Sequence, residues 1–481
     1  DCARTQLHSG LYISHTRQQW SRLTRPLPTS TSSTTHDYNR KVAREMSMPN
    51  APPPSYNLHD LKTSSVLELT SNEITHQSEK IREKNAPREG KLTTSDVGAL
   101  VHIIKSSMGS GFLAMPSAFH NIGLLMGLGS TAFVALICTH CTHIVVKCSQ
   151  ELCYQRNLEF MSYTDTVEWA FKLGASRRFS KWSDFMRAVA NFFMFITYYG
   201  VNTVYVILIA TTFKQVVEDH WDLNLNIRVY VLALTVVLLP VGIVRHMKFL
   251  VPFSAIANIF LLVGCTLTLY LCFFDLPPLS SRPMIVDVAR WPLFFSTALF
   301  GMEGIGTVMP IENAMRKPGH FLGCPGVLNI GMTVVASTFL VVGAVGYVKY
   351  GNDVQGNITL NLPQDALSES VKILVALAIL FTYPLQLTAS MEVVWQGICD
   401  KFSEENQDKA YYFTRALMIL GTVVIAVVLP NLSPVLSLVG AIGFSGLGLL
   451  LPTVAEVVTY WDYISKPFGL TIIKAAILVV L

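Results

Sequence analysis

The chain has 481 residues, of which 51% are hydrophobic and 14% charged, and its mean hydropathy is +0.43. These values lie outside the range of soluble domains and indicate an integral membrane protein. The net charge of +4 reflects lysines and arginines between the apolar segments, so it predicts no nucleic-acid partner.

Residues 1–90 are rich in Ser, Thr, Pro and charge and lack apolar periodicity, so we expect a disordered cytoplasmic tail. Residues 1–45 hold several arginines and few acids, which fits either translated upstream sequence, with Met46 or Met48 as the start, or a transit peptide. Within the tail, Pro53-Pro54-Ser55-Tyr56 matches the Pro-Pro-x-Tyr pattern that WW domains bind. A WW-domain protein is therefore a candidate partner.

Residues 91–481 form the predicted transmembrane domain, in which apolar runs of about 20 residues recur, long enough to cross the ~30 Å of bilayer hydrocarbon. The fold class that follows is an all-α integral membrane protein with about 11 transmembrane helices. The predicted spans are 97–120, 123–147, 188–213, 228–245, 249–273, 291–314, 326–348, 370–397, 411–430, 434–457 and 467–481.

Cations are concentrated in alternate loops, for example at Arg177, Arg178 and Lys181, and the positive-inside rule then places the N-terminus in the cytoplasm. The loops 216–226, 275–290 and 351–368 fall on the outer or luminal face. Asn357, in the sequon Asn357-Ile358-Thr359, becomes a candidate glycosylation site there.

The sequence contains no P-loop, nucleophile elbow or dinucleotide fingerprint in a supporting context, so we predict no enzyme and no cofactor. Cys138, His140, Cys141 and His143 resemble metal ligands, but they lie on one apolar helix without a facing set of ligands. We interpret them as packing residues and expect no metal site.

Two predicted spans are interrupted by similar glycine clusters. The first contains Gly109-Ser110-Gly111 and the second Gly304-Ile305-Gly306, each followed within a few residues by proline. Unwound backbone inside a bilayer costs several kcal/mol for each unpaired group, so it persists where it is buried or lines a polar cavity. Breaks at corresponding positions of two spans indicate the substrate site of a transporter.

A break in each span exposes the ends of two half-helices. We expect half-helices over 98–108 and 112–120, with Ser106–Gly111 unwound between them. The free N–H groups there suit a carboxylate, and the carbonyls around Met302–Gly306 suit an ammonium group. The predicted substrate-binding residues are Ser106, Ser107, Gly109, Ser110, Gly111, Phe300, Met302, Gly304 and Gly306.

Two titratable residues lie at these breaks and are the candidates for proton coupling. His102 precedes the first break by about two turns, and Glu303 lies inside the second. Histidine titrates near neutral pH, and a carboxylate within a membrane is costly unless it is paired, protonated or hydrated. A helix-packing hydrogen bond is the alternative role for His102.

Several stretches in order resemble the proton-coupled amino acid transporters of the amino acid/auxin permease group. They are Gly98–Lys105 running on through Gly109–Pro116, Tyr163–Asp165, Phe213–Val216, Phe300–Gly306 and Pro310–Asn313. The resemblance covers about residues 90–481. It implies a LeuT-like fold with helices 1–5 and 6–10 as inverted repeats, and it places the family's proton-linked histidine at His102. The family's extracellular disulfide has no counterpart in the predicted outer loops.

We therefore expect a proton-coupled symporter that moves small neutral amino acids such as glycine, alanine or proline into the cytosol, with the proton as coupling ion. It would reside in the plasma membrane or in a lysosomal or endosomal membrane. One alternative is an amino-acid sensor that signals to cytosolic partners. Another is a sodium-coupled carrier of the same fold, in which Ser106, Ser107 and Ser445 contribute to a cation site.

Overall fold

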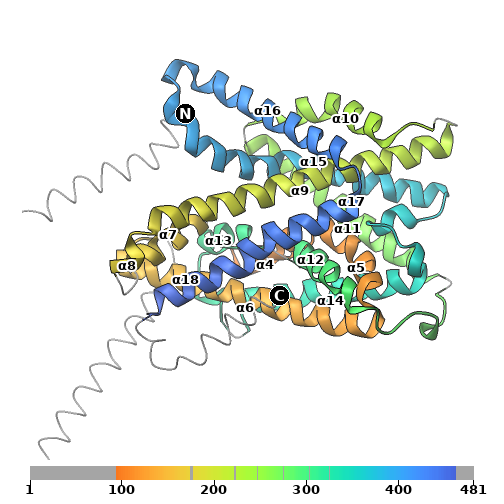
Figure 1. Cartoon of the computed structure of the whole chain (residues 1–481), viewed down its shortest axis with the longest axis horizontal. Helices are drawn as coiled ribbons and strands as arrows, with labels where there is room; N and C mark the ends of the chain where they lie inside the picture. The colour runs from red at the N-terminus through yellow and green to blue at the C-terminus, as the bar shows by residue number, and fades with distance from the viewer. Residues whose placement is uncertain are drawn as a thin grey trace, which may run out of the picture. The chain divides into compact units, whose positions relative to one another are not determined.

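A computed structural model describes residues 94–461, apart from 174–176, 222–223, 246, 275, 303 and 324. The predicted tail 1–90 with its Pro-Pro-x-Tyr motif, Glu303 and the predicted span 467–481 lie outside these residues. Throughout the described ranges the regular elements are helical, and their long axes run roughly side by side (Figure 1).

The first half of the transmembrane domain contains a broken helix followed by four further membrane helices. In chain order these are α4 (Asp96–Ser107), η1 (Ser110–Ala114), α5 (Met115–Ile122), α6 (Leu124–Arg156), α9 (Ser183–His220), α10 (Ile227–Gly242) and α11 (Met247–Phe273). Two helices that were not predicted, α7 (Tyr163–Leu173) and α8 (Arg177–Ser180), connect α6 to α9.

The second half repeats this order. Its elements are α12 (Trp291–Met302), α13 (Ile305–Asn313), α14 (Val327–Tyr350), α15 (Ala366–Ile398), α16 (Gln407–Val428), α17 (Leu432–Leu438), the π-helical segments η9 (Val439–Phe444) and η10 (Gly446–Leu450), and α18 (Leu451–Thr459). Short 3₁₀ turns occupy the loops at η2 (Leu279–Ser281), η3 (Val288–Arg290), η4 (Pro318–His320), η5 (Gly351–Asp353), η6 (Ile358–Asn361), η7 (Cys399–Lys401) and η8 (Glu404–Asn406).

Ten of the eleven predicted spans thus correspond to helices of the described part, and the two halves pack against each other element by element. The second helix of each half, α6 and α14, are neighbours, as are the third pair α9 and α15 and the fourth pair α10 and α16. Pairing of equivalent helices with opposite direction is expected for an inverted repeat. The protein is an all-helical membrane protein of LeuT-like type.

Local sequence signals account for where the first span begins and ends. Ser95 caps α4 by accepting a hydrogen bond from the Gly98 N–H at 3.2 Å, and Asp96 lies in the first turn, where the helix dipole favours an acidic residue. At the other end, Gly123 has a φ of 95°, and a Cβ there would lie 2.7 Å from the Met284 carbonyl oxygen. Glycine is therefore required where α5 turns into α6.

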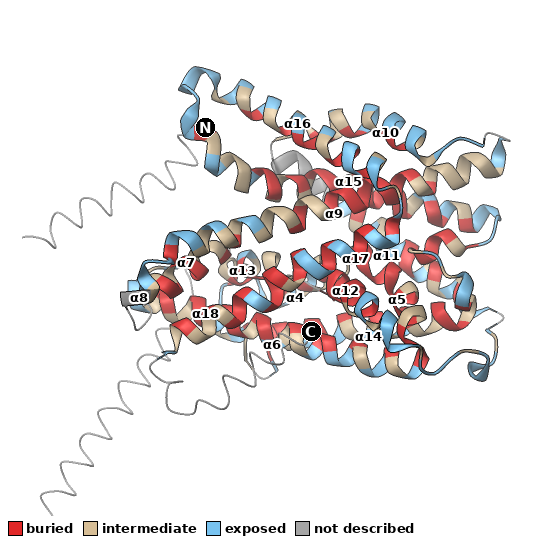
Figure 2. Ribbon diagram, viewed as in Figure 1, coloured by how far each residue is buried: buried red, intermediate tan, exposed pale blue. Residues whose placement is uncertain are grey.

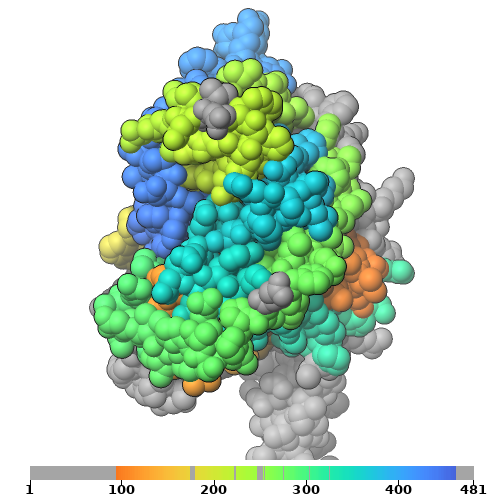
Figure 3. Space-filling model, turned by 90° about the vertical axis from the view of Figure 1, so that its right-hand side faces the viewer, coloured from red at the N-terminus to blue at the C-terminus, as the bar shows by residue number. Residues whose placement is uncertain are grey.

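The loops predicted to share the outer face do lie together. Gln364 donates a hydrogen bond to Asp219 at 2.6 Å, and the Arg282 Nε atom donates to the Val348 carbonyl at 2.9 Å. In Figure 3, which looks onto this end of the helices, the yellow-green segment around the end of α9 adjoins the cyan segment around the start of α15. Which end faces the cytoplasm stays a prediction from loop charge.

The glycosylation prediction does not fit this fold. Asn357 caps η6, is 1% exposed, and accepts hydrogen bonds through Oδ1 from the backbone N–H and the hydroxyl of Thr359, at 3.0 and 3.1 Å. Its Nδ2 atom, where a glycan would be attached, is buried. A glycan at this position would have to displace the packed loop.

A buried arginine joins three helices of the scaffold. The side chain of Arg415 on α16 is 0% exposed, and its guanidinium donates to the carbonyls of Gly242 on α10 and Pro384 on α15, at 2.5 and 3.2 Å. It also donates to the hydroxyls of Thr388 and Tyr411, both at 3.0 Å. Buried residues are concentrated in the interior of this bundle, as Figure 2 shows in red. Each of the four oxygens that accept a hydrogen bond from the Arg415 guanidinium is neutral, and none belongs to a carboxylate.

Candidate functional site

The first predicted break is present but shorter than expected. Helix α4 ends at Ser107, the chain bends by 41°, and the 3₁₀ turn η1 begins at Ser110. Only Met108 and Gly109 lie between them, because Ser106 and Ser107 complete the last turn of α4 while Ser110 and Gly111 enter η1. The tighter turn keeps most backbone groups hydrogen-bonded, which limits the cost of breaking a helix in the membrane.

The second break separates α12 from α13. Helix α12 ends at Met302, and Gly304 caps α13 with φ −109° and ψ 12°. The Gly304 carbonyl accepts hydrogen bonds from the backbone N–H groups of Thr307 and Val308 and from the Thr307 hydroxyl, at 2.9, 3.1 and 2.7 Å. That carbonyl is therefore engaged within α13, and the unpaired carbonyls expected near this break belong to the last turn of α12.

The two broken spans cross each other at their breaks. A Cβ on Gly111 would lie 2.3 Å from the Cα atom of Gly301, so the two backbones are in direct contact there. A Cβ on Gly304 would lie 2.8 Å from the Ser107 hydroxyl and 3.5 Å from the Ser106 hydroxyl. The structure thus brings together residues of both predicted clusters, as a shared site requires.

The four site glycines differ in what surrounds them. Gly111 faces backbone, and a Cβ on Gly306 would lie 1.9 Å from the hydroxyl of Tyr198. A Cβ on Gly109 would meet only the Tyr205 hydroxyl, at an ordinary contact distance of 3.8 Å. Close packing of protein thus explains Gly111 and Gly306, while Gly109 would tolerate a methyl group without a clash.

Two tyrosines of α9 that the sequence analysis missed reach the breaks. Tyr205 forms a side-chain hydrogen bond with Ser110, and the Tyr198 hydroxyl fits against Gly306. They are seven residues apart, about two helical turns, and therefore share one face of α9. The spacing was visible in the sequence, but the same spacing is common in ordinary helix packing.

Phe300 and Met302 are buried at the end of α12. Phe300 makes an edge-on contact with Phe444 of η9, with ring centroids 5.7 Å apart. The π-helical segment packs closely here, since a Cβ on Gly440 would lie 1.9 Å from the Ser296 carbonyl oxygen of α12. π-Helical turns are frequent at functional sites, and here η9 packs against α12 next to the second break.

Of the two predicted proton-coupling residues, the structure describes only His102. His102 lies on α4 about two turns before the break and is exposed on the helix surface. Glu303 lies outside the described residues. The coupling role of both residues therefore stays a prediction.

Hydrogen bonds join the C-terminal end of α13 to neighbouring elements. Gln150 of α6 donates to Glu312 at 3.1 Å, and Glu312 is 1% exposed. Asn313 donates to the Met161 carbonyl before α7 at 2.8 Å. The sequence analysis noted Glu312 and Asn313 as part of a family-like stretch, and the structure adds that they join α13 to α6 and its following loop.

The remaining polar candidates form no further site among the residues that the structure describes. In these ranges no three His, Cys, Asp or Glu side chains are grouped as a metal would require. The cysteines of the described part are buried: Cys138, Cys141, Cys148, Cys153, Cys265, Cys272 and Cys399. Ser445, suggested for a sodium site, donates its hydroxyl to the Ala441 carbonyl of its own helix.

Residues 93–480 match the family model described as transmembrane amino acid transporter protein. The chain belongs to this family. It is similar to the proton-coupled amino acid transporter-like protein pathetic of Drosophila melanogaster, with 37% identity over 382 residues, 78% of this chain and 80% of the fly protein. It is also similar to vacuolar amino acid transporter 4 of Saccharomyces cerevisiae, with 28% identity over 322 residues, 65% of this chain and 42% of the yeast protein. The family is one of transporters and not of enzymes.

We expect Tyr205→Phe to weaken substrate binding while leaving the fold intact. The change removes the hydroxyl that pairs with Ser110 and would lie 3.8 Å from a Cβ on Gly109, but it keeps the ring that packs in the core. We expect the Tyr205 hydroxyl to bind a substrate carboxylate as well, and loss of one hydrogen bond to such a charged group predicts a rise in apparent KM of about tenfold. The measurement is uptake against substrate concentration, normalised to folded protein. The control is Tyr199→Phe, whose hydroxyl donates to the Met418 carbonyl of the scaffold; an equal rise in KM in both variants would contradict the assignment.

Proposed function

We propose that this protein is a proton-coupled symporter that moves small neutral amino acids of the glycine, alanine and proline class into the cytosol by alternating access. The observation that carries the proposal is the crossing of two broken helices at Gly111 and Gly301, with Ser107 against Gly304. In this proposal the substrate lies beside Gly109, between the start of η1 and the end of α12. The two helix ends offer opposite partial charges to the two charged groups of an amino acid.

The contacts at the breaks favour a small substrate. Protein atoms already lie against Gly111, Gly304 and Gly306, whereas an added Cβ on Gly109 would meet only the Tyr205 hydroxyl at 3.8 Å, so we assign the ligand to the side of Gly109. In this proposal the carboxylate binds the backbone from Gly109 to Gly111 and the Tyr205 hydroxyl. The ammonium binds the last carbonyls of α12, next to Phe300 and Met302.

The name of the fly relative, a proton-coupled amino acid transporter-like protein, supports the proton as coupling ion. The name of the yeast relative, a vacuolar transporter, supports a lysosomal or endosomal membrane, with the plasma membrane as the alternative. In either membrane, downhill proton flow into the cytosol would drive the substrate in the same direction.

The test is uptake by the purified protein in liposomes, with a pH gradient and a panel of labelled amino acids. Uphill uptake of glycine, alanine and proline that collapses with a protonophore supports the proposal. Uptake that needs sodium, judged by replacing sodium with choline at constant pH gradient, would identify the sodium-coupled carrier. Saturable binding without flux would identify a sensor.

We expect His102→Ala to abolish uphill accumulation while leaving a folded protein that still binds substrate. His102 is exposed on α4, so its removal leaves no cavity in the core. Accumulation ratio at imposed pH gradients and substrate-induced thermal stabilisation measure the two properties separately. His320→Ala, at an exposed histidine that pairs with Asp96 in the first turn of α4, is the control. Undiminished uphill uptake by His102→Ala would remove this residue from the coupling mechanism.

A further inference from the structure

A groove lies between α6 and α18, two neighbouring helices that end on the same side of the membrane. Its volume is about 310 Å³. Its lining residues are Leu136, Thr139, His140, His143, Ile144, Lys147 and Glu456. All but Glu456 come from one stripe along α6, since their spacing of three or four residues keeps them on one helical face.

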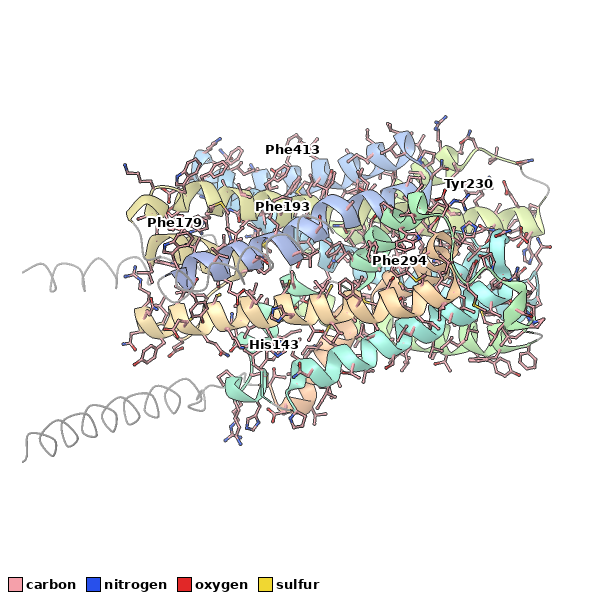
Figure 4. The ribbon with its side chains drawn as sticks, turned by 60° about the horizontal axis from the view of Figure 1, so that its bottom comes forward. His143, Phe179, Phe193, Tyr230, Phe294 and Phe413 are labelled. Carbon is pink, nitrogen blue, oxygen red and sulfur yellow. The ribbon has the colours of Figure 1, made fainter. Side chains whose placement is uncertain are left out.

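This stripe faces away from the protein core. Leu136 is 70% exposed, and His140 and Lys147 are exposed as well, while Ile144 forms the buried floor. Figure 4 shows His143 at the edge of α6. On a helix that spans a membrane, an exposed face of this kind meets lipid.

The position of the stripe along α6 spans the boundary between hydrocarbon and headgroups. The helix begins at Leu124 directly after the turn at Gly123, and at about 1.5 Å per residue Lys147 lies roughly 35 Å along it. Leu136 lies at roughly 18 Å by the same measure. With a hydrocarbon core of ~30 Å, Leu136 lies within the membrane and Lys147 reaches the far interface.

The charges in the groove are of both signs. Lys147 and His140 offer hydrogen-bond donors from α6, whereas His143 donates its Nδ1–H to the Thr139 carbonyl at 2.9 Å; Glu456 offers a carboxylate from α18. A phosphate fits the donors, and a primary ammonium fits the carboxylate as a charge-assisted donor. The carboxylate also disfavours a headgroup that carries negative charge alone.

The geometry points to a binding site for a phospholipid with a protonated primary amine, of the phosphatidylethanolamine type, in the leaflet where α6 and α18 end. The phosphate contacts Lys147 and His140, the amine contacts Glu456, and an acyl chain lies along Leu136. The site is separate from the crossing of the broken helices and does not depend on which substrate is carried.

The test is native mass spectrometry of the purified full-length chain, titrated with phosphatidylethanolamine or phosphatidylcholine of identical acyl chains. We expect one saturable site that binds phosphatidylethanolamine about tenfold more tightly, because a quaternary choline group cannot donate a hydrogen bond to Glu456. Equal affinity for the two lipids would overturn the proposal. Tighter binding of phosphatidylglycerol, or no saturable site, would do the same.

Two substitutions test the phosphate contact and the amine contact of the headgroup separately. Lys147→Gln should weaken binding of both lipids by about tenfold, while Glu456→Gln should abolish the preference between them. The control is Lys409→Gln, at an exposed lysine near the start of α16 on the same side of the membrane, which should bind as wild type. Wild-type binding by Lys147→Gln would overturn the proposal. His140→Gln, at another exposed position of the groove, repeats this test if Lys147→Gln lowers the yield.

Discussion

Replacing Gly111 with alanine will separate the two broken helices and abolish transport of every substrate. The added methyl group would lie 2.3 Å from the Cα atom of Gly301, and backbone on both sides leaves no flexible atom that can yield. Overpacking of this kind costs about 1–3 kcal/mol, and more where backbone must move. We expect a large loss of monodisperse protein in detergent, with residual uptake falling equally for glycine and proline.

The matched control is Gly109→Ala, two residues earlier on the same span. Its methyl group would meet nothing closer than the Tyr205 hydroxyl at 3.8 Å, so the variant should fold normally. Because this methyl group enters the space proposed for the substrate, proline uptake should fall before glycine uptake. Normal folding and normal uptake by Gly111→Ala would contradict the crossing. This prediction differs from the sequence analysis, which groups Gly111 with the other substrate-binding glycines, because in the structure a methyl group on Gly111 would project toward Gly301.

Replacing Arg415 with methionine will destabilise the scaffold strongly. Four oxygen atoms would lose their donor, those of Gly242, Pro384, Thr388 and Tyr411. Each buried acceptor left unpaired costs about 1–3 kcal/mol, partly offset where a helix already uses the same carbonyl. We expect a lower midpoint of thermal unfolding, by several degrees, and a lower yield from membranes.

Two other variants complete this experiment. Arg415→Lys keeps the charge but offers donors from one atom, so it should recover only part of the lost stability. Arg228→Ala is the control, because Arg228 also joins α10 to α16, through the Val427 carbonyl at 3.1 Å, but is exposed. Equal unfolding midpoints for Arg415→Met and Arg228→Ala would contradict the central role of the buried arginine.

The membrane helices could be predicted because apolar length is a strong signal, and both breaks could be predicted because similar glycine clusters occupy corresponding positions of two spans. The extent of the first break could not, since a 3₁₀ turn from Ser110 has no distinct sequence signature. The amphipathic helix α7 was missed because it lies outside the long apolar segments on which the prediction depends.

The residues that pack against the two breaks come from distant parts of the chain. Nothing near Gly306 indicates that Tyr198 lies against it, and nothing near Gly111 indicates Gly301. A glycine that admits a ligand and one that admits a neighbouring helix are alike in sequence. The glycine pattern therefore located the site, while the role of each glycine required the three-dimensional structure.

The buried arginine also bears on how the protein is made. An arginine inside a membrane helix costs up to about 2.5–3.5 kcal/mol during insertion, the value for the helix centre, and Arg415 lies in the first half of α16. The helices that supply its carbonyl acceptors, α10 and α15, both precede α16 in the chain. When Arg415 emerges from the ribosome, the oxygens of Gly242 and Pro384 have therefore already been synthesised. The order of the helices in the chain therefore means that Arg415 enters the bundle after the carbonyl oxygens that accept its hydrogen bonds.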